Sequence, residues 1–332
     1  MFIRLEKTGN NQLINAYKKN DIDRFKSLIE DGHNINCLDI DSLGLINARS
    51  LINIVIENSN SLSSSRNRKF FNLLLSSDVF LGKVCVKTPL SVSIIDQKDI
   101  YYMKKLLNIN DINKNRIIHP KNDAEFPISV LIDCILYGDS EKINLILKKT
   151  NAFKLILKTN YPILNILMWG KTSNICDLAQ KFINMGAKID QVDNITELQP
   201  IHTWSRSYSP IEINEKLLDV LLKNGASINV QCKCKASPAM HAALSYNMRK
   251  LMLLIKKGAD LSIVDSAGSN IAHYMANMER YKLNQFIEVF EKCPNLLLVE
   301  NNKGITPLAI LEKSTNRNRL FFSLKKWISQ NT

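Results

Sequence analysis

The amino-acid sequence predicts an all-α fold built from repeated pairs of short helices. The clearest pair lies in the stretch SPAMHAALSYNMRKLMLLIKKGADLSIVD, residues 237–265. Ser237 and Pro238 are typical of the first positions of a helix. Gly258, which follows an apolar helical face, is typical of a left-handed helix end. The position of Pro238 recurs along the chain at intervals of 33 to 38 residues, and a period in this range indicates a helical repeat.

This position is occupied in turn by Pro89, Pro127, Pro162, Pro200, Pro238, Ile271 and Pro307. Two weaker copies precede them, one opening at Leu13 and one at Leu51. One such unit cannot bury its own apolar faces, so neighbours are needed on both sides. We therefore expect one array, 1–332, of about nine units. Their expected places are residues 11–36, 49–80, 88–113, 126–150, 161–190, 199–229, 237–261, 269–298 and 305–329.

Several units depart from the regular pattern. Residues 58–67, NSNSLSSSRN, are too polar to pack and predict a loop between the two helices of the second unit. The third unit is expected to have an enlarged exit over residues 113–126, and the sixth has extra residues at 208–215 between its helices. The eighth lacks a glycine stop and ends at Cys293 and Pro294 instead.

The stretch from Ser237 resembles the ankyrin repeat, which reads TPLHxAA, then a second helix ending LLxxGAD, then a β-turn. Here these positions read SPAMHAA and LLIKKGAD without a gap. The TPLH histidine survives at His202 and His273. The resemblance implies an ankyrin-repeat solenoid of helix-turn-helix units with hairpin-like fingers. It also implies that the two histidines stiffen the stack by hydrogen bonds between units.

Composition adds expectations about the surroundings of the protein. The seven cysteines are scattered and odd in number, and the N-terminus has no apolar segment, so we expect reduced thiols in the cytoplasm. No apolar run is long enough to cross a membrane. The net charge is +13, but the lysine pairs at 104–105, 148–149 and 256–257 fall in the last turns of predicted helices, where cations are favourable. We expect a monomer, with neither membrane nor nucleic acid as its partner.

The sequence predicts no catalytic, cofactor or metal site. Cys232 and Cys234, with His202 and His241 in reach, suggest a metal cluster. Zinc sites, however, generally use CxxC spacing, and we expect two exposed thiols at a hairpin tip. No cysteine-hydrolase signature, phosphate-binding glycine loop or metalloprotease motif is found. The protein is therefore not expected to be an enzyme.

The resemblance implies a non-catalytic protein-interaction module that binds a protein partner on its concave surface. In the family this surface is formed by hairpin tips and first helices. The candidate tip residues are Gln191, Asn194, Gln231, Lys233, Val264, Ser266, Glu300 and Asn302, and the candidate first-helix residues are Trp169, Arg206, Tyr246 and Asn277. Trp204 occupies a position that is normally small, so its indole is either buried by local opening or lines a pocket. Asn36 and Asn229 match an asparagine that the family often carries β-hydroxylated, and they are candidate modification sites.

Two other classes remain open. One is an enzyme with a cysteine-dependent site in the degenerate N-terminal part, and the other is a basic nucleic-acid-binding scaffold. The abundance of Ile, Asn and Lys suggests an AT-rich genome. Ankyrin arrays without other domains, from such genomes, are often effectors that pathogens deliver into host cells. The resemblance thus raises an effector role, with secretion into a host cell without a cleaved signal peptide.

Overall fold

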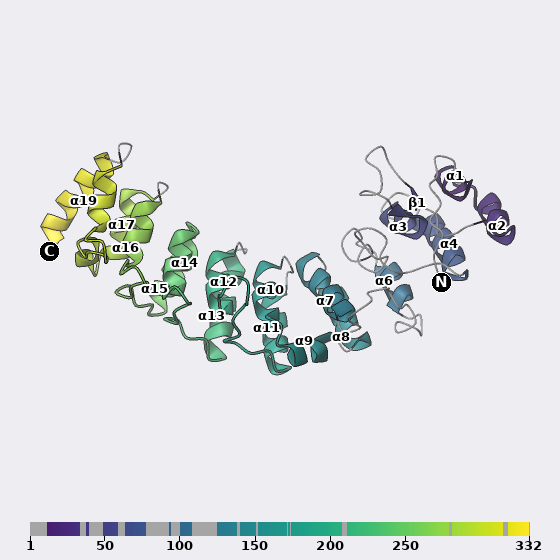
Figure 1. The fold of residues 1–332 in the computed structure, drawn as a ribbon, viewed down its shortest axis with the longest axis horizontal. Helices are drawn as coiled ribbons and strands as arrows, with labels where there is room; N and C mark the ends of the chain where they lie inside the picture. Colours follow the sequence, from purple (N-terminus) through teal and green to yellow (C-terminus); the bar gives the residue numbers. More distant parts are fainter. Residues whose placement is uncertain are drawn as a thin grey trace. The chain divides into compact units, whose positions relative to one another are not determined.

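Short amphipathic helices make up nearly all of the regular structure (Figure 1). The computed structural model describes residues 12–33, 38–39, 49–58, 64–77, 93, 100–107, 125–137, 140–150, 152–170, 172, 174–207, 211–278, 281–314 and 318–331. Over these ranges it contains 18 α-helices, which confirms the predicted all-α class. Contacts divide the chain into two units, Met1–Lys158 and Thr159–Thr332, and each is described by itself. The expected single array over 1–332 stays a prediction.

The first unit is built from helix pairs around an aromatic core. Its helices are α1 (Gln12–Lys18), α2 (Ile22–Glu30), α3 (Leu51–Glu57), α4 (Ser64–Leu75), α6 (Ile100–Leu107), α7 (Glu125–Tyr137), α8 (Ser140–Lys149) and α9 (Ala152–Thr159). Strands β1 (Leu38–Asp39) and β2 (Arg49–Ser50) pair antiparallel. Helix α1 packs on α2, α3 on α4 and α7 on α8. The rings of Phe25 and Phe70 pack edge-on with their centroids 4.9 Å apart, and the rings of Phe71 and Tyr102 do so at 4.8 Å. Aromatic pairs prefer this edge-to-face arrangement.

Three boundaries differ from the sequence-based expectation. Helix α4 begins at Ser64, so the predicted polar loop at 58–67 is wrong for its last four residues. The reason is Asn67, which is buried: its amide donates to the Asn58 carbonyl at 2.6 Å and accepts from the Tyr17 hydroxyl at 3.2 Å. Helix α13 likewise includes residues 211–215, which were expected to be extra loop. The enlarged exit expected at 113–126 lies outside the described residues except for its last two, which open α7.

Helix α9 was not predicted. It fills residues 152–159 between the expected fourth and fifth units. Ala152, Phe153 and Ile156 lie on one buried face, and this i, i+1, i+4 spacing is the signal that sequence reasoning missed.

The second unit consists of two helical layers (Figure 1). Its first-helix layer is α10 (Ile163–Trp169), α12 (Pro200–Arg206), α14 (Pro238–Leu244), α16 (Ile271–Asn277) and α18 (Pro307–Glu312). Its second-helix layer is α11 (Ile175–Asn184), α13 (Ile211–Lys223), α15 (Met248–Lys256), α17 (Leu283–Phe290) and α19 (Asn318–Asn331), with the 3₁₀ turn η3 (Pro294–Leu297) after α17. Within each layer every helix packs on the next. This places equivalent residues of successive pairs side by side.

The same turns recur at equivalent positions. Gly186, Gly225 and Gly258 have φ of +103°, +95° and +89°. The N–H group after each donates to the carbonyl five residues earlier, at 2.9 to 3.0 Å. Helix α14 begins at Pro238, and the Ser237 hydroxyl accepts from the Met240 N–H at 3.4 Å. The predicted helix start at Pro238 and the predicted glycine stop at Gly258 are therefore confirmed, and Gly186 and Gly225 repeat that stop.

The weak first pair shares its internal turn with the pair α14–α15. Asn20 and Tyr246 have φ of 58° and 54°. The residue after each, Asp21 or Asn247, caps the second helix, since its side chain accepts from the third N–H along the chain at 2.9 or 3.3 Å. Local structure is thus conserved between these two pairs although few residues are shared.

Gly258 and Gly268 predict a measurable contrast. A Cβ at Gly258 meets nothing within 4 Å. Gly258→Val should therefore lower the free energy of unfolding only through backbone strain in the left-handed conformation, by about 1 kcal/mol or more. A Cβ at Gly268 would lie 2.9 Å from the Asn302 N atom of the next hairpin. Gly268→Ala should therefore lower the free energy of unfolding by about 2 kcal/mol or more. Urea unfolding measures the free energy of unfolding of both variants. A smaller loss of stability for Gly268→Ala than for Gly258→Val would contradict the close approach of Asn302 to Gly268.

The predicted positions of the basic residues are also confirmed. Lys104 and Lys105 fall in the last turn of α6, Lys148 and Lys149 in that of α8, and Lys256 in that of α15. These five lysines therefore lie where the sequence placed them, and Lys257 follows as the C-cap of α15.

Candidate functional site

Four hairpin tips precede first helices of the second unit, and their backbones match. In each tip an N–H donates to the carbonyl four or five residues later: Asp193 to Leu198 at 3.0 Å, Cys232 to Ala236 at 3.1 Å, Asp265 to Ser269 at 3.0 Å and Asn301 to Ile305 at 3.0 Å. The left-handed positions of the four turns are Glu197, Lys235, Gly268 and Gly304. Because the tips share one geometry and stand before stacked helices, they form a row.

Neighbouring tips are hydrogen-bonded to one another. The Ser266 N–H donates to the Cys234 carbonyl at 2.9 Å, and the Asn302 N–H donates to the Ala267 carbonyl at 3.0 Å. The Gln231 amide donates to the Val264 carbonyl at 3.1 Å. An ion pair between Lys233 and Glu197 links the first two tips. The tip row is therefore continuous from residue 191 to residue 304.

The predicted site residues separate into two rows. The eight tip candidates are exposed, apart from the half-buried Gln191. Trp169, Arg206 and Asn277 end α10, α12 and α16, and Tyr246 lies just after α14. These four stand at the far ends of helices of seven residues, about 10 Å from the tips.

Lys233 and the pair Trp169 and Tyr246, all candidates for one concave surface, therefore do not converge on one spot. Lys233 lies on a tip, whereas Trp169 and Tyr246 lie at the opposite helix ends. Tyr246 also packs edge-on against the Tyr281 ring at 4.8 Å, so it is part of the packing. Trp169 is 50% exposed and remains available on the surface.

Three exposed apolar residues lie on the tips. Sequence reasoning missed Val192 and Ile195, and it named Val264 only as one tip position among others. Ile195 is 92% exposed, and Val192 and Val264 are each 42% exposed. Val192 and Ile195 belong to the tip at 191–198, and Val264 belongs to the tip two units further on. Single exposed apolar residues are common. On hairpin tips whose backbone is already ordered, these three side chains add exposed apolar area to the tip row.

The two TPLH histidines are structural, as the resemblance implied. The Gln199 and Asn270 N–H groups donate to Nδ1 of His202 and His273 at 3.3 and 3.2 Å. The opposite ring nitrogens face the carbonyls of Val230 and Ile305 at 3.1 and 2.9 Å. Burial lowers the pKa of His202 to about 4 and also lowers that of His273. Both rings are thus neutral, and each ties its first helix to the following tip.

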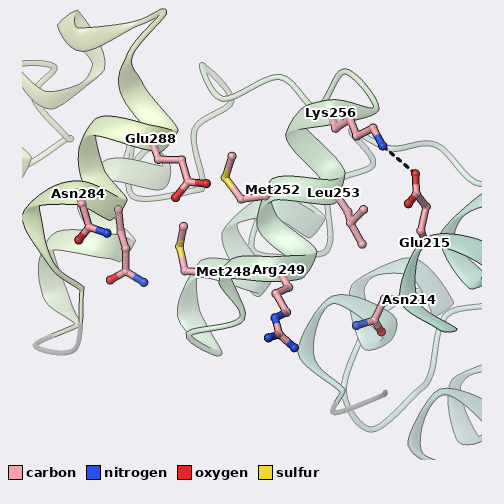
Figure 2. A pocket seen from close by; sticks show the side chains of 10 residues that line it. Asn214, Glu215, Met248, Arg249, Met252, Leu253, Lys256, Asn284 and Glu288 are labelled. Carbon is pink, nitrogen blue, oxygen red and sulfur yellow. Dashed lines mark hydrogen bonds and ion pairs between the residues drawn. The ribbon is translucent and has the colours of Figure 1, made fainter. Parts of the chain in front are cut away.

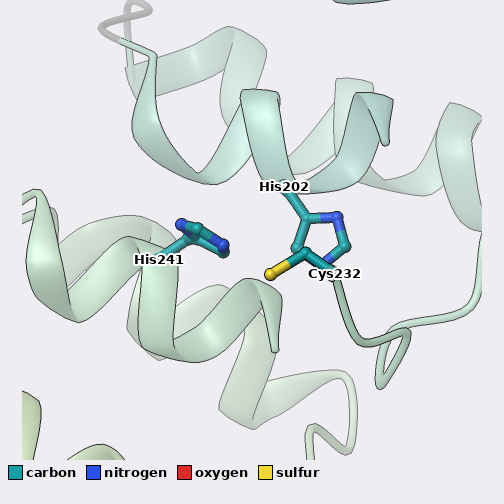
Figure 3. Close-up of side chains that lie close together, drawn as sticks. All are labelled: His202, Cys232 and His241. Atoms are coloured by element: carbon teal, nitrogen blue, oxygen red, sulfur yellow. The ribbon is translucent and has the colours of Figure 1, made fainter. Parts of the chain in front are cut away.

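The cysteine pair on the second tip differs from its expected exposure. Cys234 is exposed, but Cys232 is half-buried. The Cys232 sulfur and one ring nitrogen each of His202 and His241 lie within 4.8 Å of one another (Figure 3). The expectation of two exposed thiols therefore holds for Cys234 alone.

A groove of about 540 Å³ lies across the second-helix layer (Figure 2). Met248, Met252 and Leu253 of α15 supply its apolar surface. Its polar lining is Asn214 and Glu215 of α13, Arg249 and Lys256 of α15, and Asn284, Gln285 and Glu288 of α17. Nothing in the sequence pattern singled out this groove, because its residues come from three helices of similar amphipathic pattern.

Two further candidates are placed by the structure. The Trp204 side chain is 0% exposed, so burial, and not a pocket lining, is the outcome at this position. The Asn229 side-chain oxygen accepts from the Asp260 N–H at 2.9 Å, and its hydroxylation stays a prediction. Asn36 lies outside the described residues.

Comparison with known proteins gives a partial similarity. Over the part of the chain that the structure describes, no helix is both long and apolar enough to cross a membrane. No family model matches the sequence. The chain is 28% identical over 121 residues to the transient receptor potential cation channel subfamily A member 1 of Drosophila melanogaster, which contains ankyrin repeats. The match covers 35% of this chain and 10% of that protein. The chain is thus similar to an ankyrin-containing protein over about a third of its length, and its all-helical structure is compatible with such repeats.

Proposed function

We propose that the chain forms an ankyrin-type solenoid that binds a protein partner, without catalysis, through its row of hairpin tips. The observation that carries this proposal is the set of hydrogen bonds between neighbouring tips, from Cys234 and Ser266 to Ala267 and Asn302. The similarity to an ankyrin-containing protein supports the same class of function. A cytoplasmic location and an effector role in a host cell belong to the proposal and rest on the sequence resemblance alone.

The tip row has the properties that favour a protein partner. Its backbone is already ordered, so binding loses little conformational entropy. Ile195, Val192 and Val264 offer apolar contact area, and charged residues such as Lys233 and Glu197 lie on the same row of tips. An apolar centre with a polar rim is the common composition of protein interfaces. The partner is thus expected to span at least the tips at 191–198 and 231–236.

Affinity purification with three baits tests the proposal. Wild-type chain is compared with a tip variant, Ile195→Asp with Lys233→Glu, and a groove variant, Arg249→Glu with Glu288→Lys. All four residues are exposed, so thermal unfolding should be nearly unchanged. Extracts are treated with nuclease, which removes proteins bridged by nucleic acid. Mass spectrometry should show partners that are captured by the wild type and the groove variant but lost with the tip variant, since truncating an anchor weakens binding by about 2 kcal/mol.

The groove over α13, α15 and α17 is the second candidate surface, because methionine-rich apolar surfaces adapt to many partners. Partners lost only with the groove variant would move the interface to the second-helix layer and refute the tip row. Partners kept by both variants would refute both surfaces.

A further inference from the structure

Four side chains that commonly bind metals meet where α12, the tip at 231–236 and α14 come together. His202 lies on α12, His241 on α14, and Cys232 and Cys234 on the tip. In Figure 3 the Cys232 sulfur lies between the two imidazole rings. The atoms of His202, Cys232 and His241 are within 4.8 Å of one another, and the Cys234 sulfur is 3.0 Å from that of Cys232. Ligand atoms of a tetrahedral zinc ion stand about 3.3 to 3.8 Å apart, as bond lengths of roughly 2.0 to 2.3 Å require. The ligand atoms of His202, Cys232 and His241 would therefore have to approach by up to about 1.5 Å, and Cys234, which is near Cys232 but outside this group of three, would have to turn toward the two rings.

His241 is the residue of this cluster whose burial is otherwise unexplained. Its side chain is 6% exposed, and neither ring nitrogen has a hydrogen-bond partner within the described part of the chain. Burying an imidazole without a partner is unfavourable, and buried polar groups are nearly always satisfied. An imidazole without such partners keeps a ring nitrogen available, and the neutral ring is the form that binds a metal ion.

His202 is held by its backbone partners Gln199 and Val230. Binding a metal ion through Nδ1 would release the Gln199 N–H and keep Nε2–H donating to the Val230 carbonyl, which would fix the orientation of the ring. Binding through Nε2 would instead leave a protonated Nδ1 facing the Gln199 N–H, so the ring would also have to turn. Histidine ligands of zinc generally have the former arrangement, with the second ring nitrogen bonded to a carbonyl or carboxylate.

We propose that Cys232, Cys234, His202 and His241 bind one zinc ion that joins α12, the tip at 231–236 and α14. Two thiolates and two neutral imidazoles are a donor set of structural zinc sites. The two thiol protons are released to solvent on binding, so the thiolate charges balance the charge of the ion. The inference is independent of the partner-binding proposal, since it concerns the packing of two first helices.

Metal titration of the full-length, reduced chain tests this site. After treatment with a chelator, the chain should take up one zinc ion that survives gel filtration, and its unfolding temperature should rise with zinc concentration. Cobalt should give the visible absorption typical of tetrahedral coordination, with thiolate-to-metal charge transfer. Cys232→Ser and His241→Asn should each weaken zinc binding more than about tenfold, since even partners beyond the direct ligands account for that much.

Two further variants distinguish a built site from adventitious binding to thiols. Cys293→Ser removes a half-buried thiol of the same unit outside the cluster and should leave zinc affinity and the cobalt spectrum unchanged. Cys234→Ser changes an exposed residue, so the fold is retained, and it should halve the charge-transfer band. Absence of stoichiometric zinc in the wild type would overturn the proposal. So would unchanged affinity in a folded His241→Asn chain, because the thiol pair alone would then be the binding group.

Discussion

Replacing Lys250 with methionine is expected to lower the free energy of unfolding by about 3 kcal/mol. Lys250 lies on α15 and is 0% exposed. Its ammonium donates to the Trp204 carbonyl, to the Ser207 carbonyl at 2.6 Å and to the Ser207 hydroxyl at 3.0 Å. These acceptors lie at the C-terminal end of α12, where a cation is favourable. Methionine preserves much of the volume but removes the charged donor from all three acceptors. The Trp204 carbonyl keeps the Ser207 N–H and hydroxyl as donors, and the Ser207 carbonyl keeps only the Asn247 amide at 3.4 Å.

The effect of Lys250 should also depend on pH. Burial lowers the pKa of Lys250 from 10.5 to about 7. Between these values the unfolded chain binds more protons than the folded chain, so the contribution of Lys250 to stability rises with pH. The difference in unfolding free energy between wild type and Lys250→Met should therefore grow from pH 7 to pH 10.5. Tyr274 and Tyr281 have raised pKa values, so their contribution to stability falls as the pH rises. This contribution is the same in wild type and in Lys250→Met, and it cancels in the difference between the two unfolding free energies.

Urea unfolding across this pH range measures both effects. Lys256→Met is the matched control, because Lys256 lies on the same helix but is exposed and paired with Glu215 at 3.0 Å. Lys256→Met should lower the free energy of unfolding by less than about 1 kcal/mol. A difference between wild type and Lys250→Met that stays constant with pH would show that the three acceptors and the Trp204 ring, 4.9 Å away, keep Lys250 charged despite its burial.

Trp204→Ala should lower the free energy of unfolding by about 3 to 5 kcal/mol, because it empties the space of a fully buried tryptophan. Trp204→Phe should have a much smaller effect. The indole N–H of Trp204 is buried and has no acceptor within the residues that the structure describes, so removing it offsets part of the lost packing. Chemical unfolding of the two variants gives the comparison directly.

Trp169→Ala is the control for this series. Trp169 also lies at the end of a first helix, but it is 50% exposed, so its replacement should change stability by less than about 0.5 kcal/mol. Equal losses for Trp204→Ala and Trp169→Ala would contradict the assigned burial. Because Lys250 contacts Trp204, their combined effects should deviate from additivity by about 0.5 to 3 kcal/mol.

The sequence by itself determined the local structure of the helix pairs. Ser237, Pro238 and Gly258 each act through their own backbone or through an N–H three or four residues away, so their roles follow from spacing alone. The candidate tip residues lie on turns for the same reason, and their role in binding stays a prediction. Boundaries failed where a distant partner intervened: Asn67 joined α4 because the hydroxyl of Tyr17 lies within its reach.

Only the tertiary structure decided which residues of different pairs meet. His202 and His241 are equivalent neither in motif position nor in hydrogen bonding, yet the stacking of α12 on α14 places them together with Cys232. Lys250 reads as an ordinary surface lysine in a helix of mixed polarity, and its burial is possible only because the Trp204 carbonyl and the Ser207 carbonyl and hydroxyl accept from it at the end of α12. Spacing along one chain segment cannot reveal such contacts, because burial and partners depend on how neighbouring layers pack.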